Sequence, residues 1–129
     1  MAGETNFQRM IKKMKLTLTA LTVAATIFAS SASAFDPDDL QKLKDTNECR
    51  ICDLTNANLF GANLFGTNLS DANLFGGDLS DANLVGANLS DSNLESANLE
   101  SANLSGAIMQ GAILCNTTMP DGSVIYSGC

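Results

Sequence analysis

A leucine recurs at every fifth position over most of this chain, and that spacing restricts the fold more than any other feature of the sequence. The series runs without a gap from Leu54 to Leu104 and continues in the same frame through Met109, Leu114 and Met119. Successive members would point about 140° apart on an α-helix, and they would alternate between the two faces of a continuous strand. Neither element can therefore bury the whole series on one side.

A chain that turns a corner every five residues can bury the whole series, because each leucine then lies on the inside of a new wall. The residue two places before each leucine shares its face, since side chains alternate along extended backbone. These positions hold only small residues, as a narrow interior requires, and the exceptions to alanine are Cys52, Thr67, Gly77, Ser92 and Thr117. Asn or Asp precedes the leucine from Asp53 to Asn103, where a short polar side chain can hydrogen-bond the backbone of a turn.

The stretch ANLFGANLFGTNLSDANL, residues 57–74, resembles the A(D/N)LXX signature of the pentapeptide-repeat family, and the likeness extends over residues 52–119. The resemblance implies an all-β solenoid, a right-handed quadrilateral β-helix with four pentads in each coil and about 3.5 coils in total. Leucines twenty residues apart, such as Leu54, Leu74 and Leu94, are then expected to stack on one wall.

The segments on either side of the repeats are expected to close the ends of the solenoid, where open strand edges would otherwise promote aggregation. Residues 35–51 form the expected N-terminal cap or linker, in which a proline, an acidic first turn and late lysines predict a short helix from about Pro37 to Lys44. Residues 120–129 begin with a Pro-Asp-Gly turn and are expected to fold back as a C-terminal cap.

Residues 1–34 have the pattern of a cleaved signal peptide. The uncharged run over residues 16–29 is 14 residues long, whereas a membrane-spanning helix needs roughly 20. It follows three lysines, Lys12, Lys13 and Lys15, and it precedes small residues that suit cleavage before Phe35. We therefore expect export, and the resemblance to exported pentapeptide-repeat proteins implies the periplasm or the thylakoid lumen, between which these residues do not distinguish. A retained anchor or a buried helix is the alternative.

The mature chain, residues 35–129, carries 13 acidic and 3 basic residues, which gives a net charge of 3 − 13 = −10. Such a charge disfavours contact with nucleic acid and with anionic lipid, and it suits either solubility or a basic protein partner. We expect no nucleic-acid partner and no membrane insertion after signal cleavage. A monomer and a homodimer are both compatible with the sequence.

An exported chain with four cysteines is expected to form two disulfide bonds. On the β-helix that the resemblance implies, Cys52 and Cys115 would lie about three coils apart, roughly 15 Å along the axis and beyond the reach of a disulfide. We therefore expect Cys49–Cys52 at one end of the repeats and Cys115–Cys129 at the other. A redox-active CxxC motif and half of a zinc site are the alternative interpretations of Cys49 and Cys52.

The sequence offers no set of residues with the spacing of a catalytic or cofactor site. It contains no histidine, which excludes the usual Ser-His-Asp and Cys-His arrangements. Glycine motifs that bind phosphate are also missing. We therefore expect neither an enzyme nor a cofactor or metal site.

One set of apolar side chains is not required by the repeat fold. Directly after the central leucine, where side chains should face solvent, the first two coils carry the residues here called the Phe collar: Phe60, Phe65, Phe75 and Val85. Clustered exposed aromatic residues often mark contact surfaces. Residues 35–48 could instead cover part of the Phe collar, and the sequence leaves the two interpretations level.

The sequence thus predicts an exported, non-enzymatic structural or protein-interaction module whose Phe collar binds an unidentified protein. Its signal and cysteine-flanked repeats resemble the exported pentapeptide proteins of cyanobacteria. The resemblance also implies an alternative, because some members of the family mimic the shape and charge of duplex DNA and bind DNA gyrase. The export signal and the short repeat region argue against this alternative.

Overall fold

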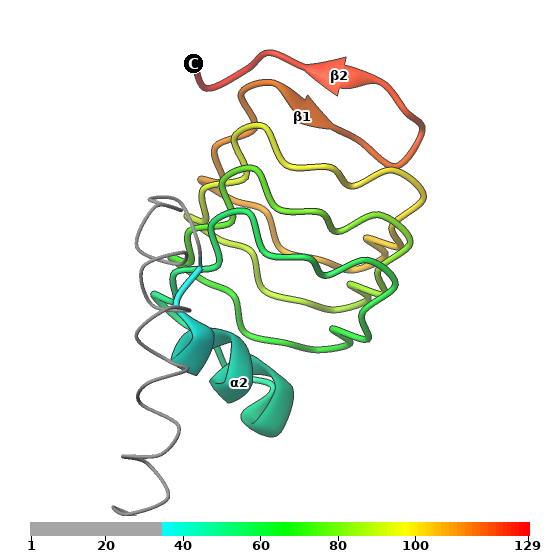
Figure 1. The fold of residues 1–129 in the computed structure, drawn as a ribbon. Coiled ribbons are helices and arrows are strands. Elements are labelled where there is room, and N and C mark those ends of the chain that lie inside the picture. Colours follow the sequence, from blue (N-terminus) through cyan, green and yellow to red (C-terminus); the bar gives the residue numbers. More distant parts are fainter. Residues whose placement is uncertain (1–34) are drawn as a thin grey trace, which may run out of the picture. The chain divides into compact units, whose positions relative to one another are not determined.

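The computed structural model describes residues 35–129, and the expected signal peptide at residues 1–34 lies outside the described residues. The named elements are helix α2 (Pro37–Thr46) and two short strands, β1 (Thr117–Thr118) and β2 (Val124–Ile125). Between α2 and β1 the backbone winds in stacked coils (Figure 1). No helix within residues 35–129 is long and apolar enough to cross a membrane.

The coils are joined by parallel bridges between residues that lie twenty positions apart. Eleven such bridges follow one another at steps of five residues, beginning with the bridge between Glu48 and Asn68. Because twenty residues contain four five-residue steps, the bridges fall in four columns, one for each side of the coil. We name the four sides after one residue of each column: the Asp53, Asn58, Asn63 and Asn68 sides.

Each corner of the coil is a tight turn that contains a residue with positive φ. At the first corner after the Asp53 side, the N–H of Ala57 donates to the carbonyl of Leu54 at 3.0 Å, and Asn56 between them has a φ of 56°. This pattern is typical of a type II turn, which favours Gly or Asn at its third residue. The Asn or Asp before the leucines up to Leu104 supports the backbone: Oδ1 of Asn58, for example, accepts the N–H of Phe60 at 3.1 Å.

The interior of the coils is filled by the repeat leucines. All ten central leucines from Leu54 to Leu99 are at most 4% exposed. Burial of one leucine side chain contributes about 1.5–3 kcal/mol, so this column of side chains is the main favourable term against the entropy of the chain. The small residue two places before each leucine leaves room for its neighbours.

Helix α2 closes part of the N-terminal end. The carboxylate of Asp36 caps it by accepting the N–H of Asp38 at 2.9 Å, Pro37 occupies the first turn, and Asn47 ends it in the left-handed conformation with a φ of 58°. The helix runs two residues further than the expected end at Lys44. It faces the coil with Leu43, which is buried against the repeat leucines.

The coil begins before the boundary that the sequence motif indicates. We placed the start of the repeats at residue 52, but Glu48 already pairs with Asn68, and the N–H of Cys49 donates to the carbonyl of Asn68 at 2.8 Å. Cys49 is fully buried in the position of a central leucine. The coiled path of the backbone therefore starts one pentad before the first residue with the repeat signature, because residues 47–51 follow the path of the repeat without its signature residues.

The C-terminal end is closed by strand β2 and by the tail that follows it. Strand β2 pairs with β1 in antiparallel register, Thr117 with Ile125 and Thr118 with Val124, so it adds one layer to the Asn58 side. Asp121 in the connecting turn accepts hydrogen bonds from the hydroxyl and the N–H of Ser123, which lower the pKa of its carboxyl. The tail then returns toward the Asp53 side.

Two disulfide bonds flank the coils. Cys49 is bonded to Cys52 and Cys115 to Cys129, with Cα separations of 5.2 Å and 5.0 Å, and these pairs match those expected from the sequence. The first lies in the interior at the start of the coil, and the second attaches the tail to the last coil. With their sulfurs joined, Cys49 and Cys52 cannot bind zinc as thiolates.

Candidate protein-interaction surface

The aromatic side chains of the Phe collar lie on the outside of the first two coils. Phe60 and Phe65 are each 61% exposed and Phe75 is 38% exposed, whereas Val85 is half-buried. Residues 35–48 therefore do not cover Phe60 or Phe65. Large apolar side chains with much exposed area can mark contact surfaces, and outside the Phe collar the described chain exposes Ile51, Ile108, Ile113, Val124 and Tyr126 as well.

The fold separates the members of the Phe collar instead of gathering them in one patch. Phe65 and Val85 lie on the Asn63 side in successive coils, since Asn63 and Asn83 before them are bridged. Phe60 lies on the neighbouring Asn58 side, around the corner at Gly61. Phe75 lies on a third side, the Asp53 side, one coil further along. A flat partner could therefore not contact all four residues at once.

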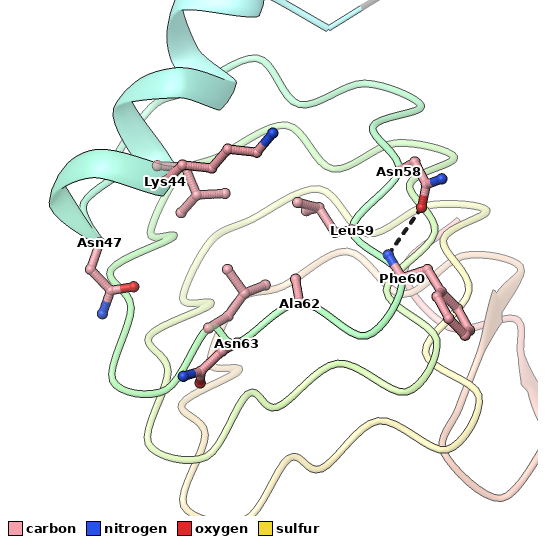
Figure 2. Close-up of a pocket in the computed structure, with 9 residues that line it drawn as sticks. Lys44, Asn47, Asn58, Leu59, Phe60, Ala62 and Asn63 are labelled. Atoms are coloured by element: carbon pink, nitrogen blue, oxygen red, sulfur yellow. Dashed lines mark hydrogen bonds between the residues drawn. The ribbon is translucent and has the colours of Figure 1, made fainter.

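A hollow of about 350 Å³ lies beside Phe60, between the C-terminal half of α2 and the first coil. Figure 2 shows that Leu59 and Ala62 face this hollow, that Lys44 and Asn63 lie at its rim, and that the ring of Phe60 points away from it. Its lining consists of Leu43, Lys44, Asn47, Asn58, Leu59, Phe60, Ala62, Asn63 and Leu64. The hollow exists because α2 is too short to cover the whole end of the coil.

The backbone at this end is capped on two sides and open on two. On the Asp53 side, the N–H of Asp53 donates to the carboxylate of Asp39 at 2.7 Å. On the Asn68 side, the N–H of Asn68 donates to the carbonyl of Asn47 at 3.3 Å. Within residues 35–129, the corresponding N–H groups of Asn58 and Asn63 have no hydrogen-bond acceptor.

The open groups form a strand edge that could accept another chain. In the next coil the same positions are paired, because the N–H of Asp78 donates to the carbonyl of Ala57 at 3.0 Å and that of Asn83 to Ala62 at 2.9 Å. An unpaired edge beside exposed apolar side chains is the arrangement that proteins use to bind an extended peptide. Sequence reasoning found Phe60 and Phe65 but missed the edge and the hollow, since both depend on where α2 ends.

One exposed ion pair lies on the Asn68 side near the start of the coils. Arg50 and Asp71 form an ion pair at 3.3 Å, and because both side chains are well exposed the pair contributes little to stability. Within residues 35–129, His, Cys, Asp and Glu side chains nowhere gather in a group of three that could hold a metal ion.

The stacked coils and the buried leucine columns define a β-helical repeat protein. The sequence profile described as "Pentapeptide repeats" matches residues 52–91 and 82–119. The chain therefore belongs to the pentapeptide repeat family, as its sequence predicted, and the fold is the right-handed β-helical solenoid of that family. Proteins of this family are generally structural or interaction modules.

Three solved structures illustrate the likeness. A pentapeptide repeat protein from Nostoc PCC 7120 is 32% identical, covers 66% of this chain and 79% of its own, and gives a TM-score of 0.38. HetL is a pentapeptide repeat protein involved in heterocyst differentiation regulation in Nostoc sp. strain PCC 7120 and is 40% identical. The match covers 56% of this chain and 40% of HetL, with a TM-score of 0.23.

The third is a pentapeptide repeat protein from the thylakoid lumen of Arabidopsis thaliana, which is 29% identical. The match covers 60% of this chain and 55% of the Arabidopsis protein, with a TM-score of 0.29. The present chain thus spans about half or less of the length of the last two proteins. A comparison with curated protein sequences found no match.

Proposed function

We propose that this protein is an exported, non-enzymatic interaction module of the thylakoid lumen or the periplasm, which binds an extended segment of a partner protein at the N-terminal end of its coils. The open strand edge on the Asn58 and Asn63 sides, next to the hollow and the exposed Phe60 and Phe65, is the observation that carries this proposal. A rigid solenoid suits this role because its binding surface is formed before the partner arrives.

The partner segment adds a strand along the edge of the Asn58 side. Its backbone bonds the free N–H of Asn58, and its side chains alternate between the hollow and the outer wall that carries the ring of Phe60. An apolar side chain fits the hollow, whose floor is formed by Leu43, Leu59 and Leu64. The net charge of −10 of the mature chain favours a partner with basic residues beyond this segment.

The proposal is tested by capturing proteins from lumen or periplasm extracts on the immobilised mature chain. The double variant Phe60→Ser, Phe65→Ser should lose a partner that the wild-type chain retains, while circular dichroism and thermal unfolding stay unchanged, because both side chains are on the outside. Phe75→Ser, on the Asp53 side, is the matched control and should keep the partner. Equal loss in both variants, or no difference between either variant and the wild type, would contradict the proposed surface.

Export is tested by the intact mass of the protein from separated compartments of its native cell, with alkylation before reduction. We expect a species that begins at Phe35, has no free thiol and is confined to the lumen or periplasm. A full-length reduced species in the cytoplasm would contradict export.

The arrangement of charge does not favour the alternative of a DNA mimic. Residues 101–120, the last full turn of the coil, contain no acidic residue, and Asp71 in an earlier coil is paired with Arg50. A duplex mimic needs negative charge along its whole length. We therefore expect excess mature protein to leave the supercoiling activity of DNA gyrase unchanged, and inhibition would revive this alternative.

A further inference from the structure

The hollow at the N-terminal end differs in charge from the rest of the mature chain. Lys44 is the one charged residue among the nine that line it. The side chain of Lys44 is exposed and extends from α2 along the rim of the hollow (Figure 2). Residues 35–129 carry 13 acidic and only 3 basic residues, so a cation above an apolar floor is an exception on this chain. The hollow therefore favours a ligand that combines an anionic group with an apolar one.

The amino group of Lys44 has no partner among the described residues. No hydrogen bond or ion pair joins it to another residue of the described chain. Asp45, the carboxylate that follows it in α2, accepts a hydrogen bond from Nε2 of Gln41 at 2.8 Å, one turn back along the helix. The cation of Arg50 is already paired with Asp71. Lys44 is thus available for an anion from another molecule.

Hydrogen-bond donors of the first coil lie around the same hollow. The backbone N–H groups of Asn58 and Asn63 have no acceptor within residues 35–129. Oδ1 of Asn58 accepts the N–H of Phe60 at 3.1 Å, and Oδ1 of Asn63 accepts that of Phe65 at 3.3 Å. The Nδ2 groups of both asparagines have no acceptor among the described residues. An ammonium group with N–H groups beside it is an arrangement that binds carboxylates.

The open edge beside the hollow is closed at both of its ends. On the Asp53 side, the N–H of Asp36 donates to the carbonyl of Asp53 at 3.0 Å. On the Asn68 side, the backbone of Asn47 takes the place of a lower coil, and its Nδ2 donates to the carbonyl of Phe65 at 2.9 Å. A strand that ran along the whole edge would have to turn away from the solenoid at both ends. A chain that terminates in the hollow turns away at only one.

We propose that the hollow binds the C-terminal end of a partner protein, with the apolar side chain of its last residue inside and its α-carboxylate on Lys44. This inference rests on the proposed function and names the part of the partner that the surface recognises. The free N–H of Asn58 or Asn63 donates to the backbone of that end. A C-terminal residue fits because it carries an apolar side chain and a carboxylate together, whereas an Asp or Glu within a chain does not.

Pools of short random peptides that end in Leu, Ile, Val or Phe test this proposal. One pool has a free α-carboxylate and the other a C-terminal amide, and both are passed over the immobilised, oxidised mature chain. Enriched peptides are made again in both forms, and their dissociation constants are measured by fluorescence anisotropy. We expect the free acids to be enriched and amidation to weaken each of them about 10-fold or more, because it removes the charge that Lys44 binds.

Substitution of Lys44 locates the carboxylate. Lys44→Met keeps the length of the side chain and removes its charge, so it should weaken the free acids about 10-fold and abolish their advantage over the amides. Lys44→Arg should keep that advantage. Lys42→Met is the matched control, because it removes a charge from the same helix at a residue that does not line the hollow, and it should bind as the wild type does.

The outcomes separate this inference from the proposed function. Equal binding of acids and amides, weakened in both forms by Phe60→Ser, would overturn the inference and leave the proposed surface in place. Amides with an internal Asp or Glu that bind as tightly as the free acids would also overturn it, as would a preference for acids that survives Lys44→Met. If neither pool yields a peptide that binds, both the inference and the proposed binding of an extended segment are wrong.

Discussion

At the scale of the residue, the corner positions decide how closely successive coils can approach. Gly76 has a φ of 64°, and a Cβ on this residue would lie 2.1 Å from Oδ1 of Asn56 in the coil below. Gly86 has a similar φ of 67°, yet a Cβ there would meet no atom within 4 Å. Both residues need glycine for their positive φ, but only Gly76 also needs it because a side chain would meet the neighbouring coil.

Gly76→Ala should therefore destabilise the protein more than Gly86→Ala. Both substitutions put a side chain in the left-handed region, at a cost of about 1 kcal/mol, and only Gly76→Ala also displaces the side chain of Asn56. We expect the free energy of unfolding of Gly76→Ala to be about 1 kcal/mol lower than that of Gly86→Ala, as measured by urea denaturation of the oxidised chain. Equal destabilisation would show that Asn56 moves aside without cost.

At the scale of the element, α2 is joined to the coil by the packing of Leu43 and Leu40 and by hydrogen bonds of Asp36 and Asp39 to the backbone of Asp53. Leu43 packs on the interior, and the carboxylate of Asp39 accepts the N–H of Asp53. In later coils the equivalent N–H donates to the preceding coil, which the first coil does not have. The helix thus replaces a strand on the Asp53 side and leaves the hollow on the two sides that it does not reach. Its length sets the extent of the proposed binding surface.

Asp39→Ala should loosen α2 without unfolding the coils. The substitution leaves the N–H of Asp53 without its acceptor, so we expect a loss of about 1–2 kcal/mol in local stability. Hydrogen exchange of the Asp53 amide should accelerate, while that of Leu84 in the middle of the solenoid stays slow. Asp38→Ala is the matched control, because it removes a carboxylate from the same turn of the helix. If the two variants accelerate the Asp53 amide equally, the carboxylate of Asp39 does not hold the helix in place.

At the scale of the whole described chain, the two ends of the solenoid differ in how firmly they are closed. The disulfide between Cys49 and Cys52 is buried under α2, whereas Cys129 is exposed and joins only a short tail to the last coil. A repeat protein is stabilised by contacts between neighbouring coils, so each end can open without the other.

Mild reduction of the native protein should open the two disulfides in order. A reductant can reach Cys129 directly, but it reaches Cys49 only after α2 has moved, because access limits thiol–disulfide exchange. Alkylation at timed intervals followed by peptide mass spectrometry should find Cys115 and Cys129 modified before Cys49 and Cys52. Simultaneous modification of all four cysteines would indicate that reduction requires unfolding of the entire solenoid.

The sequence by itself determined the repeat, the family and the buried leucines, because each rests on a period that every coil must obey. The expected pairs of cysteines also needed the stacking of coils that the resemblance to the family implies. The stacking of leucines twenty residues apart did predict that Phe65 and Val85 share one side while Phe60 and Phe75 lie on others. The sequence could not place the start of the coil at residue 47, since Cys49 takes the path of the repeat without its signature, and only the bridge from Glu48 to Asn68 shows this. Which edges stay open depends on how far α2 and the tail extend over ends that the repeat itself does not describe, and the tertiary structure alone decides that.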